Sequence, residues 1–350
     1  MTDDLARKLE AFLARQDERA DLAVTEFREL VAGWSRQTYL AAIRRAPDAA
    51  LQRVVVQVEK AGGVIADSSM ARDVQVLRVL SAAGLPVARP LWASDDASIL
   101  GGPFMVAQLL PGRSFDMSDA AQRETLRSHA QRDSGLGAAI VDALAAVHST
   151  PVEHLPFLPS AELGRATAQY EIDRCRRLAQ LARVEHEPVV ALAFHWLERH
   201  RPASGTLALV HGDFHMRNLL IDGERVTGIV DWEVTRISEP LFDLAYMSIP
   251  YLGGKFFTPG AELVAGVLPQ DRLLAEYQGR TGRRIGEADF HFWRVLATLS
   301  LLLVVSKGVS DFEAGTLTSA RNAWARFSEP VLHEDILNLL TMPAARHAGA

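Results

Sequence analysis

The hydrophobic periodicity of this 350-residue chain changes once, near residue 110, and this change constrains the fold more than any other feature. Before that point, short β-type runs alternate with turn signals, which predicts strands over 23–30, 36–43, 51–58, 88–94 and 103–110. The stretch 68–83 has helical spacing instead. The first third is therefore expected to be an antiparallel sheet that carries one helix.

The remainder of the chain has a mostly helical pattern. Helices are predicted over about 119–149, 160–182, 188–200, 269–279, 289–307 and 317–340. A β insertion over 206–231 contains the hairpin-favouring pair Asp222 and Gly223. We therefore expect an α+β chain with an N-terminal helix over 1–22, a small lobe over 23–110 and a large, mostly α-helical lobe over 111–350.

Composition and charge narrow the class of protein. Apolar residues make up 48% of the chain and charged residues 23%, which is typical of a globular protein. The formal net charge of -6 argues against a nucleic-acid binder or an anionic-membrane binder. The sequence predicts no membrane span, and an N-terminal stretch without an apolar signal-peptide core predicts a cytoplasmic protein. The single cysteine, Cys175, excludes an intrachain disulfide and a cysteine-based zinc site. Monomer and homodimer both stay open.

Three oxygen-bearing side chains surround the predicted hairpin. Asn218 and Asp231 are equally far from a turn expected near residues 224 and 225, so they should face each other at its open end. Amide and carboxylate oxygens are ligands that Mg²⁺ accepts when phosphates complete its coordination. Asp213 follows an apolar strand, and a carboxylate there can take the proton of an attacking hydroxyl. The pattern therefore indicates phosphoryl transfer.

The stretch HGDFHMRN (211–218), followed by Asp231 in IVDWE, resembles the catalytic and metal motifs of the aminoglycoside phosphotransferase family, relatives of protein kinases. The resemblance runs from about 33 to 327 and implies a two-lobed protein-kinase-like fold. It further implies transfer of the γ-phosphoryl group of ATP or GTP, with Mg²⁺, to a hydroxyl of a small molecule. The stretch 277–293 is similar to the branch of the family associated with acyl-CoA dehydrogenases. The possible acceptors are therefore a hydroxyacyl-CoA and an aminoglycoside or macrolide-like compound.

The resemblance also implies roles for single residues in the second half of the chain. Asp213 corresponds to the catalytic base, and Asn218 and Asp231 correspond to the Mg²⁺ ligands. His211 would support the catalytic loop, and Asp243 in EPLFDLAY would buttress it.

The first third matches the family's nucleotide site in part. AGWSRQTYLAAI resembles the nucleotide-binding turn, where Gly33 lets backbone N–H groups approach phosphate and Ser35 can donate a further hydrogen bond. The resemblance places Gln108 and Leu110 in the segment that joins the lobes, where backbone groups can bind the base.

One position departs from the family pattern. Gln57 stands where a third-strand lysine or arginine is expected, and Asp73 stands where a glutamate on the following helix is common. Arg36, Arg53 and Lys60 are three candidates for the missing cation, and the sequence does not choose among them.

Two other functions stay open at this point. The missing cation favours a non-catalytic, nucleotide-binding pseudokinase-like module. The alternation of His211, Asp213 and His215 is compatible with a metal-dependent hydrolase, although His215 also suits a loop position near phosphate or substrate. Glu233 is expected either beside the metal or as a surface ion-pair partner. His148, at the predicted end of a helix, is expected to cap or pack.

Overall fold

The structure is a computed structural model that describes residues 2–18, 21–30, 36–46, 48–59, 69–161, 167–202, 205–258, 263–317 and 320–341. The chain divides into two compact units. The first unit is Met1–Pro111 together with Gly228–Val234, and the second is Gly112–Thr227 together with Thr235–Ala350. Gly33, Ser35 and Lys60 lie outside the described residues.

A five-stranded sheet forms the centre of the first unit, with strand order β1-β2-β3-β5-β4. All neighbouring strands run antiparallel. The strands are β1 (Ala23–Glu29), β2 (Arg36–Arg44), β3 (Gln52–Glu59), β4 (Pro90–Ser94) and β5 (Phe104–Gln108). The predicted strand positions and the small antiparallel sheet are confirmed.

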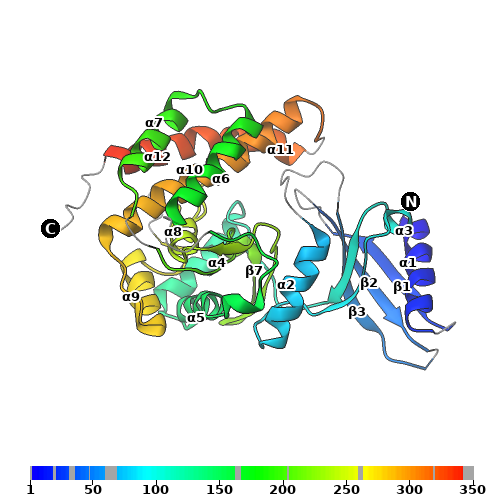
Figure 1. Cartoon of the computed structure of the whole chain (residues 1–350). Helices are drawn as coiled ribbons and strands as arrows, with labels where there is room; N and C mark the ends of the chain where they lie inside the picture. The colour runs from blue at the N-terminus through cyan, green and yellow to red at the C-terminus, as the bar shows by residue number, and fades with distance from the viewer. Residues whose placement is uncertain are drawn as a thin grey trace. The chain divides into compact units, whose positions relative to one another are not determined.

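Side-chain alternation decides which face of this sheet is the core. In β3, Val54, Val56 and Val58 are buried against α1 (Thr2–Gln16), whose Leu9 and Phe12 belong to the same cluster. Two helices cover the two faces of the sheet, α1 on one and α2 (Met70–Ala82) on the other, and α3 (Ala97–Leu100) lies beside α1 (Figure 1). The odd-numbered side chains of β3 therefore lie on the face that α2 covers.

The second unit is mostly helical. Its helices are α4 (Ala120–Gln131), α5 (Leu136–His148), α6 (Thr167–Ala182), α7 (Pro188–Arg199), α8 (Leu241–Met247), α9 (Gln270–Thr281), α10 (Glu287–Glu313), α11 (Ala320–Ala325) and α12 (Glu329–Thr341). The described residues also form short 3₁₀ helices, η1 (Val152–His154), η2 (Met216–Asn218) and η3 (Arg326–Ser328). Together with the first unit, this arrangement confirms the expected α+β fold class.

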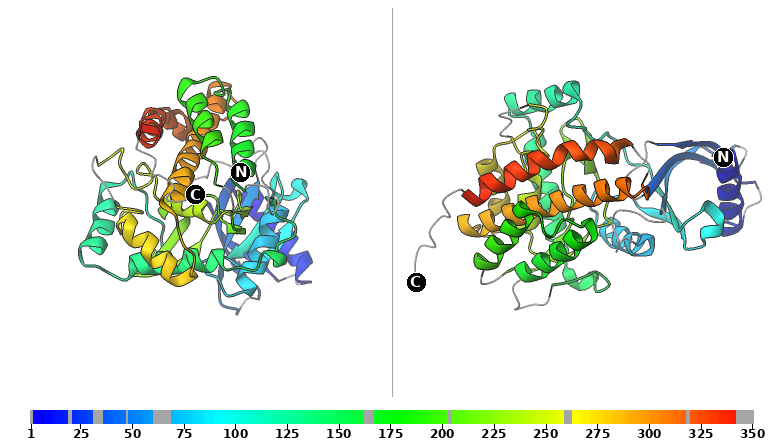
Figure 2. Two further views of the ribbon diagram at one scale, coloured as in Figure 1. Left: turned by 60° about the vertical axis from the view of Figure 1, so that its left-hand side comes forward. Right: turned by 90° about the horizontal axis from the view of Figure 1, so that it is seen from above.

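Helix α10 forms the centre of this unit. It packs against α6, α7, α8, α11 and α12, and Figure 2 shows α10 and α12 side by side. Among the described residues, α10 alone is long and apolar enough to cross a membrane, but 72% of its most apolar window is buried inside the protein. Its apolar surface is therefore accounted for as the core of the helical unit.

The predicted helix over 119–149 is two helices in the structure. Helix α4 begins after the N-cap Asp119 and ends at Gln131, and α5 begins after Gly135. Between them, Asp133 has φ +47°, a left-handed conformation that a continuous helix does not contain. The short helix α8 was not predicted, because six of its seven residues are buried and the segment therefore shows little helical periodicity.

Two small β ribbons complete the second half of the chain. Strands β6 (Ala208–Val210) and β9 (Arg236–Ser238) pair antiparallel, and β7 (Leu219–Asp222) pairs with β8 (Arg225–Ile229). The turn between β7 and β8 is Gly223–Glu224, one residue earlier than predicted, because Gly223 adopts φ +62° at its first position. Asn218 lies four residues before Asp222 and Asp231 six after Arg225, so the predicted equal spacing is wrong.

Candidate functional site

The loop after β6 carries the polar residues of the HGDFHMRN motif. Strand β6 is fixed by β9, with Val210 opposite Arg236, and the Thr235 hydroxyl donates a hydrogen bond to the Val210 carbonyl at 2.7 Å. The loop therefore starts from a paired, buried strand, which is how a rigid site is built.

Asp243, on α8, holds the first residues of this loop. Its Oδ2 accepts the backbone N–H of His211 and its Oδ1 accepts that of Gly212, both at 2.8 Å. Gly212 has φ +86°, a conformation that glycine adopts without a steric penalty. Asp243 thus contacts the loop directly, as the resemblance implies for a buttress.

Two further buried side chains hold Asp243 itself. His148 Nε2 lies 3.1 Å from Asp243 Oδ2, and His148 Nδ1 lies 2.7 Å from the Tyr277 hydroxyl. Burial alone would raise the pKa of Asp243, but the hydrogen bond and charge of His148 lower it. His148 is the last residue of α5 and packs in the interior as expected, but its hydrogen bonds to Asp243 and Tyr277 were not predicted. Nothing local in the sequence signals this pairing, since 95 residues separate His148 from Asp243.

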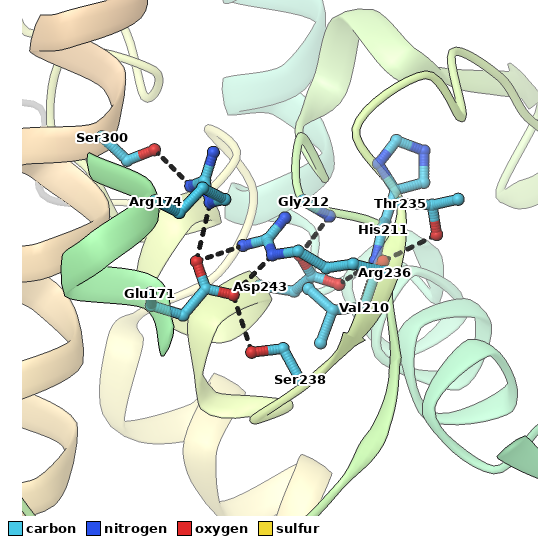
Figure 3. Close-up of polar contacts among 10 residues, drawn as sticks. All are labelled: Glu171, Arg174, Val210, His211, Gly212, Thr235, Arg236, Ser238, Asp243 and Ser300. Atoms are coloured by element: carbon cyan, nitrogen blue, oxygen red, sulfur yellow. Dashed lines mark hydrogen bonds and ion pairs between the residues drawn. The ribbon is translucent and has the colours of Figure 1, made fainter. Parts of the chain in front are cut away.

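A second set of contacts holds β9 to α6 (Figure 3). Glu171 accepts hydrogen bonds from Arg236, from Ser238 at 2.7 Å and from Arg174 at 2.9 Å, and Arg174 also donates to Ser300. Glu171 is fully buried, and although burial would raise its pKa, Arg236 and Arg174 lower it to about 2. This cluster was not predicted from the sequence, because a Glu–Arg pair 65 residues apart has no local signature.

Asp213 lies in the same loop and keeps 28% of its side-chain surface exposed. The Asn218 amide donates to Asp213 Oδ2 at 2.8 Å, His215 Nε2 lies 3.3 Å from Oδ1, and the Tyr246 hydroxyl donates a further hydrogen bond. Burial would raise the pKa of Asp213, but His215, Tyr246 and His211 lower it to about 2. The carboxylate is therefore ionised at neutral pH and can accept a hydrogen bond from a ligand hydroxyl.

His215 points toward Asp213 for a local reason. It is the N-cap of η2, and its Nδ1 accepts the backbone N–H of Arg217 at 3.4 Å. With Nδ1 as acceptor, the neutral ring carries its proton on Nε2 and donates toward Asp213. This assignment follows from the hydrogen-bond network.

Asn218 and Asp231 are the expected metal ligands. The Asn218 side-chain N–H groups donate to both the carbonyl and the carboxylate of Asp213, which leaves the amide oxygen as its remaining ligand atom. Asp231 belongs to the first unit and has φ +68°, in the left-handed region that non-glycine residues rarely occupy. Backbone strain of this kind is concentrated at functional positions.

The metal-hydrolase alternative finds no support. His211 is fully buried, and its Nδ1 accepts the backbone N–H of Asp213 at 3.2 Å. Over the ranges that the structure describes, no three His, Cys, Asp or Glu side chains are arranged to hold a metal ion. His211, Asp213 and His215 are neighbours in one loop but do not form a ligand cluster.

The first unit contains the other predicted polar residues. Arg36 Nη2 lies 2.6 Å from Asp73 Oδ2, and Arg36 Nε lies 3.8 Å from Glu233 Oε2. Glu233 is buried, so the expectation of a surface ion pair is wrong, although the residue does pair with an arginine. Gln57 is half-buried, opposite Thr38 on one neighbouring strand and Met105 on the other.

The segment after β5 was expected to bind the base. The Gln108 backbone N–H already donates to the Arg89 carbonyl at 3.0 Å, and the Gln108 side chain is exposed. Leu109 is 37% exposed and Leu110 is half-buried. A base-binding role for Gln108 and Leu110 stays a prediction.

Comparisons with known proteins agree with one another. The family described as "Phosphotransferase enzyme family" matches residues 26–284. Acyl-CoA dehydrogenase family member 11 of Mus musculus is 26% identical over 319 residues, which cover 87% of this chain and 39% of that protein. The chain therefore spans about two fifths of the length of that relative.

Solved structures share the fold. A Ralstonia eutropha JMP134 protein described as a candidate aminoglycoside phosphotransferase superposes with a TM-score of 0.72 at 22% identity, covering 95% of this chain and 97% of that one. A thermostable mutant of aminoglycoside phosphotransferase APH(4)-Ia, in ternary complex with ADP and hygromycin B, gives a TM-score of 0.56 at 15% identity, with 98% and 100% covered. The family match spans well over half of the chain, and the fold agrees with it. This chain is a member of the phosphotransferase enzyme family.

Proposed function

We propose that this protein transfers the γ-phosphoryl group of a Mg²⁺-bound nucleoside triphosphate, ATP or GTP, to a hydroxyl of a small molecule. The observation that carries the proposal is the arrangement around Asp213. Its carboxylate is ionised and partly exposed, and it is fixed by hydrogen bonds from Asn218, His215 and Tyr246. An acceptor hydroxyl that donates to this carboxylate would be oriented for attack on a phosphoryl group.

The lowered pKa of Asp213 defines what this residue does. A carboxylate whose pKa is about 2 is a weak base, so it orients the hydroxyl in the ground state and takes the proton only as the new P–O bond forms. A loose phosphoryl-transfer transition state demands little proton transfer before attack. The buried contacts of Asp243 and Glu171 keep the loop fixed, so little reorganisation precedes the reaction.

The donor set suits Mg²⁺. The amide oxygen of Asn218, in the second unit, and the carboxylate of Asp231, in the first, are each a hard oxygen of the kind that this ion takes together with phosphates. Mg²⁺ neutralises phosphate charge when it is bound. In the proposed reaction, Asn218 has two tasks, because its N–H groups fix Asp213 while its oxygen serves the metal.

The acceptor is proposed by chemical class only. The mouse relative is named as an acyl-CoA dehydrogenase family member, and a structural neighbour holds the aminoglycoside hygromycin B. Hydroxyacyl-CoA thioesters and amino sugars are therefore the first candidates, followed by macrolides and choline-like alcohols.

The test is ADP release from ATP·Mg²⁺ across this panel, with the phosphorylated product identified by mass spectrometry. Asp213→Ala is expected to bind ADP·Mg²⁺ as the wild type does and to lose about 10²- to 10⁴-fold in kcat. Asp222→Ala removes an exposed carboxylate from the nearby hairpin and serves as the matched control. Turnover of Asp213→Ala within a few-fold of the control would remove Asp213 from its role.

Gln57 favours one second candidate, a nucleotide-binding module without catalysis, because the usual third-strand cation is missing there. That function predicts thermal stabilisation by ATP·Mg²⁺ with no phosphorylated product from any member of the panel. The same experiment therefore separates the two candidates.

A further inference from the structure

Gln57 stands at the strand position where the family resemblance implies a cation, and the structure shows what lies around it. Gln57 is uncharged, and it lies on β3 among the odd-numbered residues that face away from the α1 core. Helix α2, which carries the acid Asp73, covers this same face (Figure 1). A cation that replaces the missing one must therefore reach the α2 side of the sheet.

Arg36, at the start of β2, lies on that side. In the antiparallel register, Thr38 is opposite Gln57 and Arg36 is opposite Glu59. Residues opposite each other across a pair of strands share a face, and diagonal neighbours are about 7–8 Å apart. Arg36 is the diagonal neighbour of Gln57, one strand over and on the same face.

The Arg36 guanidinium reaches the acid on α2. Its Nη2 lies 2.6 Å from Asp73 Oδ2, and both side chains are almost fully buried, at 6% and 1% exposure. Charged side chains are seldom buried to this extent unless they are paired. An ion pair between a strand and α2 is thus present. Its cation is Arg36 on β2, whereas the resemblance implies a cation on β3, and its acid is Asp73 on α2.

The same guanidinium connects to the segment that contains Asp231. Arg36 Nε lies 3.8 Å from Glu233 Oε2, and Arg72, next to Asp73 on α2, donates to the Glu233 carbonyl at 3.2 Å. Burial alone would lower the pKa of Arg36, but Asp73, Glu233 and Asp231 raise it, so the guanidinium stays charged. Arg36 is therefore a cation under the influence of three carboxylates, Asp73, Glu233 and Asp231.

The ion pair does not use all the donors of Arg36. Among the described residues, its Nε and Nη2 have no well-aligned hydrogen bond despite the short ion-pair distance. Five N–H groups on one guanidinium allow it to hold Asp73 and still bind an oxygen of a ligand.

We propose that Arg36 replaces the missing third-strand cation: it joins α2 to the 231–233 segment and positions the nucleotide's phosphates within this unit. This inference rests on the proposed nucleotide-dependent function and adds to it a residue that the sequence left undecided. Of the other two candidates, Arg53 is exposed on β3, and Lys60 lies outside the described residues.

The experiment measures binding of ADP·Mg²⁺ by calorimetry, which needs no acceptor. Arg36→Gln is expected to weaken the affinity about 10- to 100-fold, the effect of losing charge-assisted contacts to phosphate. Arg53→Gln makes the same chemical change at an exposed site and is expected to leave the affinity within about twofold. The double variant Arg36→Gln/Gln57→Arg returns the cation to the third strand and is expected to recover at least half of the loss on a logarithmic scale.

A merely structural ion pair gives a different pattern, in which Arg36→Gln lowers the melting temperature while the folded variant binds ADP·Mg²⁺ as tightly as the wild type. That result overturns the inference, and so does a double variant that binds no better than Arg36→Gln. Should Arg36→Gln not fold, Asp73→Asn frees the guanidinium from its anchor, and unchanged ADP·Mg²⁺ affinity there overturns it equally.

The outcome for the wild type separates this inference from the proposed function. If the wild type binds ADP·Mg²⁺ but phosphorylates nothing, the proposed transfer reaction is refuted, whereas the inferred role of Arg36 in nucleotide binding is not affected. A wild type that binds no nucleotide refutes both.

Discussion

Asp243→Asn tests how strongly the loop depends on its buried carboxylate. Asp243 accepts two backbone N–H groups at 2.8 Å, one on each oxygen, and lies 3.1 Å from His148 Nε2. An amide offers one oxygen only, so either the His211 or the Gly212 N–H must face an NH₂ group and lose its acceptor. Breaking a fully buried charged network on one side costs about 3–5 kcal/mol, a large part of a usual stability of about 5–15 kcal/mol.

The assay is urea unfolding followed by tryptophan fluorescence at pH 7. Asp222→Asn makes the same substitution at an exposed carboxylate at the end of β7, and its free energy of unfolding is expected to change by less than about 0.5 kcal/mol. Because the pKa of Asp243 is lowered in the folded state, its contribution is present above about pH 4 and is lost as the pH falls below that value. The difference between wild type and Asp243→Asn should therefore shrink in acid. A difference at pH 7 no larger than that of Asp222→Asn would refute the reasoning.

Three other predictions concern the metal, the pH profile and the backbone. Asp231→Asn keeps a residue that tolerates φ +68° but removes its charge, so the fold should persist while Mg²⁺ no longer tightens ADP binding, as titration calorimetry would show. Tyr246→Phe removes a hydrogen bond that lowers the pKa of Asp213, so the acid limb of the kcat/KM profile should move to higher pH; an unchanged limb contradicts this. Gly112→Ala places a Cβ 2.6 Å from Thr227 Oγ1 at φ +93°, whereas Gly101→Ala has a similar φ and meets open space. Both variants should lose about 1–2 kcal/mol of stability to backbone strain, and only Gly112→Ala should lose more, through the steric clash, as thermal unfolding would show.

Local patterns predicted the parts of the fold that depend on neighbouring residues. The β-type run over 51–58 predicted a strand, and the structure confirms it as β3, with Val54, Val56 and Val58 on its buried face. The same kind of pattern could not locate the β7–β8 turn to the residue, because Gly223 takes its first position and so shifts the centre.

Residues whose partners are distant in the chain could not be predicted in the same way. In the sequence, Glu171 and Arg236 look like ordinary charged residues of a helix and a loop. Only the tertiary structure shows that they form a buried ion pair with each other. For Arg36, the sequence offered a candidate, but the choice depended on strand register and on which face α2 covers. Strand register and the sheet face that a helix covers are set when the strands and helix assemble, so the sequence pattern of one strand does not predict them.

The supports of the loop and the residue that faces the acceptor should differ in their kinetic signature. Asp243, His148 and Glu171 are buried and hold backbone or neighbouring charges, so their loss loosens the loop as a whole. Variants at these positions should lower stability and kcat together, since the loop no longer fixes Asp213 in one geometry. Asp213 itself is partly exposed, and its loss should lower kcat with little change in stability. His148 hydrogen-bonds both Tyr277 and Asp243. A His148 variant that loses activity at wild-type stability would show that this hydrogen-bond chain takes part in the reaction and does not only position the loop.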